Sequence, residues 1–276
     1  EKSLGPDNPR VADILDSIGL VLADLDRKDE ALEQHQRAQR LREKTLGPDH
    51  LDVADGEAKM GGLLHNMGRD EEAIVHDQRA LAIREKQLGP EHPEIAGTLN
   101  NLALAVRKRD HRRARALLRR SLAIREKTMP PDHPDVATTV NNLALEEFES
   151  HHYADAVALY QRAVAIWEKS LGSSHPSTLV ALYYMGRSEL GAGSHRAAAA
   201  TLERALAGYQ TAGARAPQRH VPVVRAALAD ALWRSGNKAD RKRAREQVAT
   251  ARGELLALGN KTDAAELKRW LATHRK

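Results

Sequence analysis

The chain has 276 residues, of which 41% are hydrophobic, 29% are charged and only 3% are aromatic, and it contains no cysteine. So few aromatic side chains favour a core of closely packed helices over a sheet, and the lack of cysteine excludes disulfides, thiolate metal sites and cysteine nucleophiles. The 43 basic and 38 acidic residues largely interleave, as on ordinary solvated helix surfaces. The sequence has no run of about 18 apolar residues and no signal peptide, so we expect a soluble, cytoplasmic protein.

One phrase, Glu-Lys-x-Leu-Gly-Pro-x-His-Pro, returns with small variations along the chain. It begins at Glu1, Glu43, Glu85, Glu126 and Glu168, at intervals of 42, 42, 41 and 42 residues. Glycine tolerates the left-handed conformation at the end of a helix, whereas proline cannot continue a helix but starts one readily. The phrase therefore predicts a loop between two helices, and its period predicts an array of repeated units.

The other segments follow this period in chain order. Residues 1–9 carry the phrase without the helices that would precede it, so we expect them to be the end of a preceding repeat in a longer protein. Apolar residues at three-and-four spacing then predict two amphipathic helices in each unit, for example over 136–149 and 153–169. The predicted repeats, within a single domain over 1–276, are approximately 10–50, 51–92, 93–133, 134–175, 176–218 and 219–259.

The C-terminal part departs from the period. After Val221 we expect helices over 223–234 and 241–258, joined by a longer basic connection. A further helix over 263–274 carries Leu267, Trp270 and Leu271, and these side chains could cover the last exposed apolar edge. Terminal caps of this kind are expected in solenoids, whose end units otherwise expose an apolar face.

Small residues return at three positions of the unit, where paired helices must approach each other closely. These positions hold Gly19, Gly61, Ala103, Ala144 and Gly186 in the first helix, Ala31, Ala73, Ala114, Ala156 and Ala198 early in the second, and Ala38, Ala80, Ser121, Ala163 and Ala205 seven residues later. A larger side chain at any of these positions would push the two helices apart.

Further motifs recur within the units. Asn-Asn-Leu-Ala occupies 100–103 and 141–144, an acidic-Glu-Ala start occupies 29–31 and 71–73, and Arg-Ala-Leu-Ala-Ile-x-Glu-Lys leads into the loop phrase. Together these motifs resemble the tetratricopeptide repeat family, specifically its roughly 42-residue variety known from kinesin light chains. The resemblance implies an all-α, right-handed superhelical solenoid of about six helix-turn-helix repeats with a C-terminal capping helix.

The same resemblance also implies a function. It implies a scaffold that holds a protein or peptide client in a concave groove and is not an enzyme. The C-terminal end also resembles the ends of large bacterial signalling proteins, such as serine/threonine kinases that carry these repeats. We therefore expect the chain to be a sensing or recruiting region of a larger signalling protein.

In the resembling family, side chains of the first helix of each repeat contact an extended peptide. This implies that Asn100, Asn101, Asn141 and Asn142 bind main-chain amides of the client, because an amide side chain can donate and accept at once. Neighbouring inward positions hold Lys59, His65, Asn66, Arg107, Lys108, Phe148, Tyr183, Tyr184 and Arg187. They predict a basic groove with an aromatic end, suited to an acidic client with a bulky apolar anchor. An open alternative is that one Asn of each pair only bonds to the adjacent helix.

The sequence predicts no metal ion, no cofactor and no catalytic site. The loop phrase accounts for His50, His92, His133 and His175, which lie about one unit apart and therefore too far apart for a shared ion. The pair His151-His152 lies in a turn without a matching carboxylate-histidine pattern. No nucleophile constellation, phosphate loop or nucleotide fingerprint accompanies the carboxylates.

Two other functions compete with peptide binding. Basic residues dominate 107–125 and 241–245, so nucleic-acid binding is conceivable, but aromatic side chains for base stacking are not interleaved with them. The array could instead be a structural spacer or a self-association module with no groove ligand, which leaves a homo-oligomer open. We expect no membrane partner.

Overall fold

The computed structural model describes residues 9–274, and this part of the chain contains thirteen α-helices, two short 3-10 turns and no β-strand. The predicted end of a preceding repeat, at residues 1–9, lies outside the described residues except for Pro9, which begins the first helix. No helix in the described part is long and apolar enough to cross a membrane.

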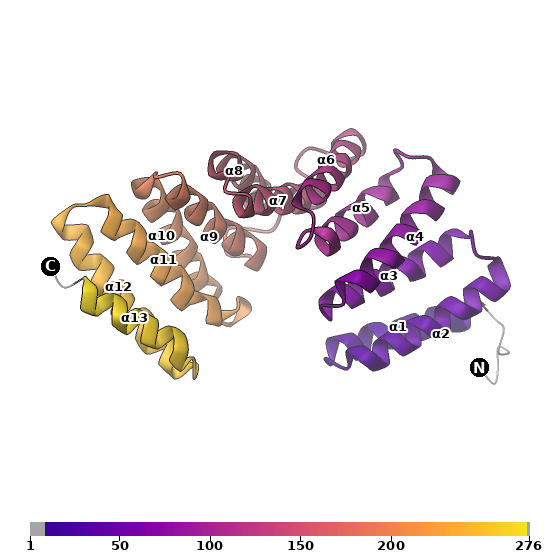
Figure 1. Cartoon of the computed structure of the whole chain (residues 1–276), viewed down its shortest axis with the longest axis horizontal. Helices are drawn as coiled ribbons and strands as arrows, with labels where there is room; N and C mark the ends of the chain where they lie inside the picture. Colours follow the sequence, from indigo (N-terminus) through magenta and orange to yellow (C-terminus); the bar gives the residue numbers. More distant parts are fainter. Residues whose placement is uncertain (1–8, 275–276) are drawn as a thin grey trace. The chain divides into compact units, whose positions relative to one another are not determined.

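The helices form two compact units, each built of helical pairs (Figure 1). The first unit ends at Met129 and contains α1 (Pro9–Asp24), α2 (Lys28–Leu46), α3 (Leu51–Asn66), α4 (Asp70–Leu88), α5 (Pro93–Val106) and α6 (His111–Thr128). The second begins at Pro130 and contains α7 (Pro134–Glu149), α8 (Tyr153–Ser170), α9 (Pro176–Gly191), α10 (His195–Ala212), α11 (Val221–Ser235), α12 (Lys238–Ala257) and α13 (Lys261–Thr273). Within each unit, consecutive helices pack against one another in chain order. The predicted all-α array of helix-turn-helix pairs with a C-terminal helix is confirmed, whereas a single domain over 1–276 stays a prediction.

The connection between α11 and α12 differs from the sequence prediction. We expected a long basic connection before residue 241, but α12 begins at Lys238, and only Gly236 and Asn237 separate the two helices. Gly236 adopts a left-handed conformation with φ of 88°, and the Asn237 side chain accepts a hydrogen bond from the backbone N–H of Asp240. The prediction was wrong because this glycine end and asparagine cap make a tight turn, and the basic residues that follow already belong to the helix.

The capping helix α13 packs against α12, as the sequence predicted. Leu267, Trp270 and Leu271 are half-buried there. The Trp270 ring lies 5.5 Å from that of Trp233 on α11 in an edge-to-face arrangement, measured between ring centroids. These contacts tie the last helix to the preceding pair.

The repeated histidines of the loop phrase have a structural role. The Nδ1 atoms of His50, His92, His133 and His175 each accept a hydrogen bond from the backbone N–H two residues later, at 3.1 to 3.4 Å. Each histidine therefore caps the helix that follows it and satisfies one of the N–H groups that a helix start leaves unpaired. This capping role explains why the histidines repeat with the loop phrase.

The lysine and the acidic residue of the phrase also meet each other across successive loops. Lys86 pairs with Asp49 at 2.5 Å, Lys127 pairs with Glu91, and Lys169 pairs with Asp132. The pairing lowers the pKa of Glu91 and of Asp132. The loop phrase thus provides ion pairs between neighbouring repeats, although each exposed pair adds little stability.

The small residues lie where the paired helices approach each other, as predicted. All of the alanines at the two second-helix positions are fully buried, and so is Ser121. In the first helices, a Cβ atom added to Gly19, Gly61 or Gly186 would come within 2.8 Å of a side chain on the second helix of the same pair.

The side chain opposite these first-helix positions varies in chemistry. It is Leu118, Tyr160 or Leu202 in three pairs, but His35 in the first pair and Asp77 in the second, and all five are buried. His35 bonds to Asp16, whereas neither carboxylate oxygen of Asp77 has a hydrogen-bond partner among the described residues. The first two pairs therefore carry ionisable groups where the others are apolar or aromatic.

Two glycine substitutions in the second unit test whether the paired helices approach each other closely. We expect Gly186→Ala to lower the stability of this unit by about 1–2 kcal/mol, because the new methyl group would lie 2.6 Å from Cγ of Leu202. Gly253→Ala on α12 is the control, because its added Cβ would have no other part of the described chain within 4 Å beyond its own turn of helix, and it should gain about 1 kcal/mol of helix propensity. Denaturant unfolding followed by circular dichroism measures both, and equal effects would contradict the proposed packing.

Candidate functional site

In the first unit, α3 and α5 line an open hollow of about 540 Å³. Its wall includes Lys59 and Asn101, two of the predicted groove residues, together with Asp55 of α3, Arg84 of α4 and Thr98 of α5. Arg84 donates hydrogen bonds to both Asp55 and Thr98. The hollow is therefore polar and its charges are partly paired within the chain.

The two asparagines of α5 occupy different environments. Asn100 is only 7% exposed, whereas Asn101 is partly exposed and lines the hollow. Of the other predicted positions in this unit, Asn66 is exposed at the end of α3 and Arg107 is half-buried after α5. Asn101 is thus the member of its pair that a client can reach, and Asn100 belongs to the packed side of the helix.

Three of the predicted basic residues of this unit lie beside carboxylates. The Nζ atom of Lys59 is 2.5 Å from Oδ2 of Asp16, and that of Lys108 is 2.8 Å from Oδ2 of Asp70. His65 bonds through Nδ1 to the other oxygen of Asp70, also at 2.8 Å. Burial acts to raise the pKa of Asp70, but the bonds from Lys108 and His65 outweigh it and lower that pKa. The first unit therefore presents neutralised ion pairs at these predicted basic positions.

The second unit brings the predicted aromatic residues together. The Phe148 ring of α7 lies 5.7 Å from that of Tyr184 on α9, and the Tyr184 ring lies 5.1 Å from that of Tyr183. The Arg187 guanidinium sits 5.2 Å from the Phe148 ring centre and 5.7 Å from that of Tyr183, and it donates a hydrogen bond to the Tyr183 hydroxyl at 3.3 Å. These four residues form one cluster of rings with a cation stacked on it.

The asparagine pair of α7 lies on the same helix as Phe148. Asn141 and Asn142 are both partly exposed, and the amide nitrogen of Asn141 donates to the side-chain oxygen of Asn142 at 3.4 Å. Both amides are therefore partly accessible, unlike the buried Asn100, which is the equivalent of Asn141 on α5.

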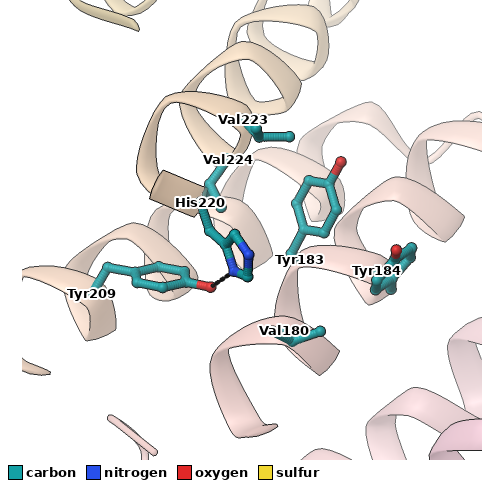
Figure 2. A pocket seen from close by; sticks show the side chains of 7 residues that line it. All are labelled: Val180, Tyr183, Tyr184, Tyr209, His220, Val223 and Val224. Carbon is teal, nitrogen blue, oxygen red and sulfur yellow. Dashed lines mark hydrogen bonds between the residues drawn. The ribbon is translucent and has the colours of Figure 1, made fainter. Parts of the chain in front are cut away.

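Beside the aromatic cluster lies a pocket of about 260 Å³. Figure 2 shows its lining residues, which are Val180, Tyr183 and Tyr184 of α9, Tyr209 of α10, His220 before α11, and Val223 and Val224 of α11. Only two of these seven residues were predicted. Four of the other five lie in the α10–α11 segment, which has lost the loop phrase, so the period did not align it with the earlier repeats; the fifth, Val180, lies on α9 and was not singled out in the sequence.

A histidine-carboxylate group was also missed in the sequence. Glu147, His152 and Asp155 each offer a possible metal-ligand atom, and these atoms lie within 4.8 Å of one another. The Nδ1 atom of His152 is, however, 2.7 Å from Oε2 of Glu147, at hydrogen-bonding distance. This contact links α7 to the turn before α8 and gives His152 a partner within the chain.

The basic stretch considered for nucleic-acid binding is partly neutralised by the preceding pair. Arg120 of α6 pairs with Glu85 of α4 at 2.6 Å, and Arg109 pairs with Glu71. Because carboxylates accompany these cations, the stretch does not form a purely positive face of the kind that follows a phosphate backbone.

Comparisons with known proteins agree with this fold. A family model described as tetratricopeptide repeat matches residues 52–127, 110–169 and 135–211, and a second model of the same description matches residues 11–52. The chain therefore belongs to the tetratricopeptide repeat family. A comparison with curated proteins found no match.

Solved structures share the architecture. A single-substitution variant of kinesin light chain TPR-like repeats from Podosopora anserina is 25% identical with a TM-score of 0.64, over 78% of this chain and 98% of that one. A signal transduction ATPase with a tetratricopeptide repeat sensor from Pyrococcus horikoshii is 13% identical with a TM-score of 0.71, over 97% and 38%. A Rap protein complexed with competence and sporulation factor is 13% identical with a TM-score of 0.63, over 95% and 74%. The chain is thus similar to kinesin-light-chain-like repeat proteins.

Proposed function

We propose that this chain is a cytoplasmic binding scaffold that holds a protein or peptide client against the first helices of its repeats. Tetratricopeptide repeats generally serve as scaffolds for protein interaction. The structurally similar Rap protein was solved in complex with competence and sporulation factor. The similar signal transduction ATPase uses such repeats as a sensor, which supports a sensing or recruiting role within a larger signalling protein.

One observation carries this proposal. The first helices α5, α7 and α9 present amide and phenol side chains that are partly exposed, namely Asn101, Asn142, Tyr183 and Tyr184. Amides bind a peptide main chain without demanding a particular sequence, and tyrosine contributes a large contact area. Each unit therefore offers groups suited to hold an extended segment.

The preference for an acidic client depends on Arg187. Lys59, Lys108 and His65 already have carboxylate partners, so a client would have to displace Asp16 or Asp70 to reach them. Arg187 stacks on two rings, and no carboxylate of the described residues pairs with it. We therefore place the acidic group of the client next to Arg187 in the second unit.

The experiment removes one accessible amide from each unit. Replacing Asn101 and Asn142 by alanine together should weaken client binding about tenfold, because each lost hydrogen bond is worth about 0.5–1.5 kcal/mol. The matched control replaces Gln78 and Gln161, exposed amides on the second helices α4 and α8. The client is first captured from lysate and then titrated by calorimetry against all three proteins.

Two results would contradict the proposal. Equal affinity for all three proteins would remove the first-helix amides from it. Light scattering of the same samples tests self-association, since a mass that rises with concentration above 30.4 kDa, without any captured client, would favour a self-association module. The candidate surface for such self-association consists of five exposed aliphatic side chains, namely Ile14, Ile18, Leu20, Val21 and Leu25.

A further inference from the structure

The pocket between α9 and α11 has an uncharged lining. Three valines and three tyrosines form most of its wall, and none of its lining residues is Asp, Glu, Lys or Arg. Burial lowers the pKa of His220, with a further contribution from Arg219, so this imidazole is neutral near pH 7. A charged group entering this pocket would lose its hydration without finding an opposite charge.

The hydrogen bond between Tyr209 and His220 determines where the imidazole hydrogen lies. The Tyr209 hydroxyl is 3.2 Å from Nδ1 of His220, and this tyrosine is only 1% exposed (Figure 2). Burial raises the pKa of Tyr209, so the hydroxyl keeps its hydrogen. That hydrogen has no other acceptor among the described residues, so the hydroxyl donates to Nδ1. The neutral ring then carries its own hydrogen on Nε2.

The Nε2–H group of His220 is a free donor at an apolar pocket. Among the described residues, the hydrogen bond to Tyr209 is the only one that the ring makes. A volume of about 260 Å³ exceeds the about 150 Å³ of an apolar cavity that binds benzene, so one bulky side chain fits. A main-chain carbonyl beside that side chain would provide the acceptor that Nε2–H lacks.

We propose that this pocket is the anchor site for one bulky, uncharged side chain of the client, aliphatic or aromatic, and that His220 donates through Nε2 to the adjacent main-chain carbonyl. This inference rests on the proposed peptide-binding function and assigns its anchor residue. Val223 is 42% exposed and lies in the wall of the pocket, where it is accessible to a ligand.

The test uses the whole chain and capped amino acids as probes. N-acetyl amides of leucine, phenylalanine and tryptophan are titrated while methyl NMR signals of Val180, Val223 and Val224 are followed. We expect saturable shifts of these methyl groups with the three bulky probes. The N-acetyl amides of alanine, aspartate and lysine should cause none at the same concentrations.

Matched variants place the binding in the pocket. Val223→Asp should weaken binding of the phenylalanine amide at least tenfold, because it puts a charge into the apolar wall. Val75→Asp, at an exposed valine on α4 outside the pocket, should leave it unchanged. His220→Phe should weaken the phenylalanine amide about fivefold but not toluene, which has no carbonyl to accept a hydrogen bond.

Other outcomes would overturn the inference. Equal shifts with all six amides, or undiminished binding to Val223→Asp, would show that the pocket is not an apolar anchor site. Shifts that grow with protein concentration alone would show that a second copy of the chain occupies it. A failure of the proposed function can be distinguished from a failure of this inference, because the Asn101 and Asn142 variants test client binding while the capped amino acids test only the pocket.

Discussion

Replacing Asp77 by leucine should raise the free energy of unfolding of the first unit by roughly 4 kcal/mol at neutral pH. The Asp77 side chain on α4 is 1% exposed, and neither of its oxygens has a hydrogen-bond partner in the described part of the chain. Burial raises its pKa from 3.8 to about 7, against the opposing charges of His76 and Arg84. A leucine already occupies the equivalent position of the fifth pair, so the introduced side chain would face Gly61 as Leu202 faces Gly186.

The sign of the pH dependence follows from the raised pKa. Between about pH 4 and pH 7 the folded chain holds the Asp77 proton more tightly than the unfolded chain does. The contribution of this group to stability therefore falls as pH rises through this range and is constant above it. Asp77→Leu removes this slope, and Asp77→Asn removes it as well but gains less stability, because a buried amide still lacks partners.

Far-ultraviolet circular dichroism during denaturant unfolding, at several pH values from 5 to 8, measures this effect. The first unit contains no tryptophan or tyrosine, so fluorescence reports only on the second unit. Hydrogen exchange of the α3 and α4 amides assigns the change to the correct pair of helices. A pH slope that persists in Asp77→Leu would contradict the assignment to this carboxylate.

The second large effect concerns Asp16, which should cost about 3–5 kcal/mol of stability when replaced by asparagine. Its carboxylate accepts from Nδ1 of His35 at 2.8 Å and from Nζ of Lys59 at 2.5 Å, and it lies 2.8 Å from the Arg42 guanidinium. His35 and Arg42 are themselves buried. Without Asp16, the Arg42 charge would stay buried with only the exposed Asp13 as a carboxylate partner.

Asp13 supplies the matched control, because its 73% exposed side chain pairs with the same guanidinium at 3.0 Å. Asp13→Asn should cost less than about 1 kcal/mol, as exposed ion pairs do. Burial acts to raise the pKa of Asp16, but bonds from His35, Lys59 and Arg42 outweigh it and hold that pKa far below the ordinary 3.8. The stability from Asp16 is therefore present above about pH 4 and is lost as pH falls toward its folded pKa. Equal losses for the two variants in thermal unfolding would contradict this account.

Asp16 and Lys59 show which part of the candidate site could not be predicted from the sequence. The position of Asp16 in the period is that of Ala58, Asn100, Asn141 and Tyr183, and the sequence analysis did not select Asp16 as a site residue. Asp16 is buried because Arg42 and His35 of the next helix contact its carboxylate. Lys59 was predicted to face a client because of its position in the first helix of its repeat, and its pairing with Asp16 became visible only in three dimensions.

The sequence by itself determined the features that are local to one helix or one loop. Its period and its Gly-Pro and His-Pro pairs located helix ends, and its small residues marked the close approaches, because these depend only on backbone preferences and spacing. Asn101 and Asn142 could be selected as amides of first helices on the same basis.

Only the tertiary structure decided which side chains meet across helices. Neighbouring residues on a helix point about 100° apart, so Asn100 and Asn101 divide into a buried and an accessible amide once α5 is packed. The tertiary structure also decided that Asp77 has no hydrogen-bond partner within residues 9–274 and that Tyr209 and His220 meet at the pocket. Burial and hydrogen-bond partners come from residues far away along the chain, and no repeat pattern within one helix records them.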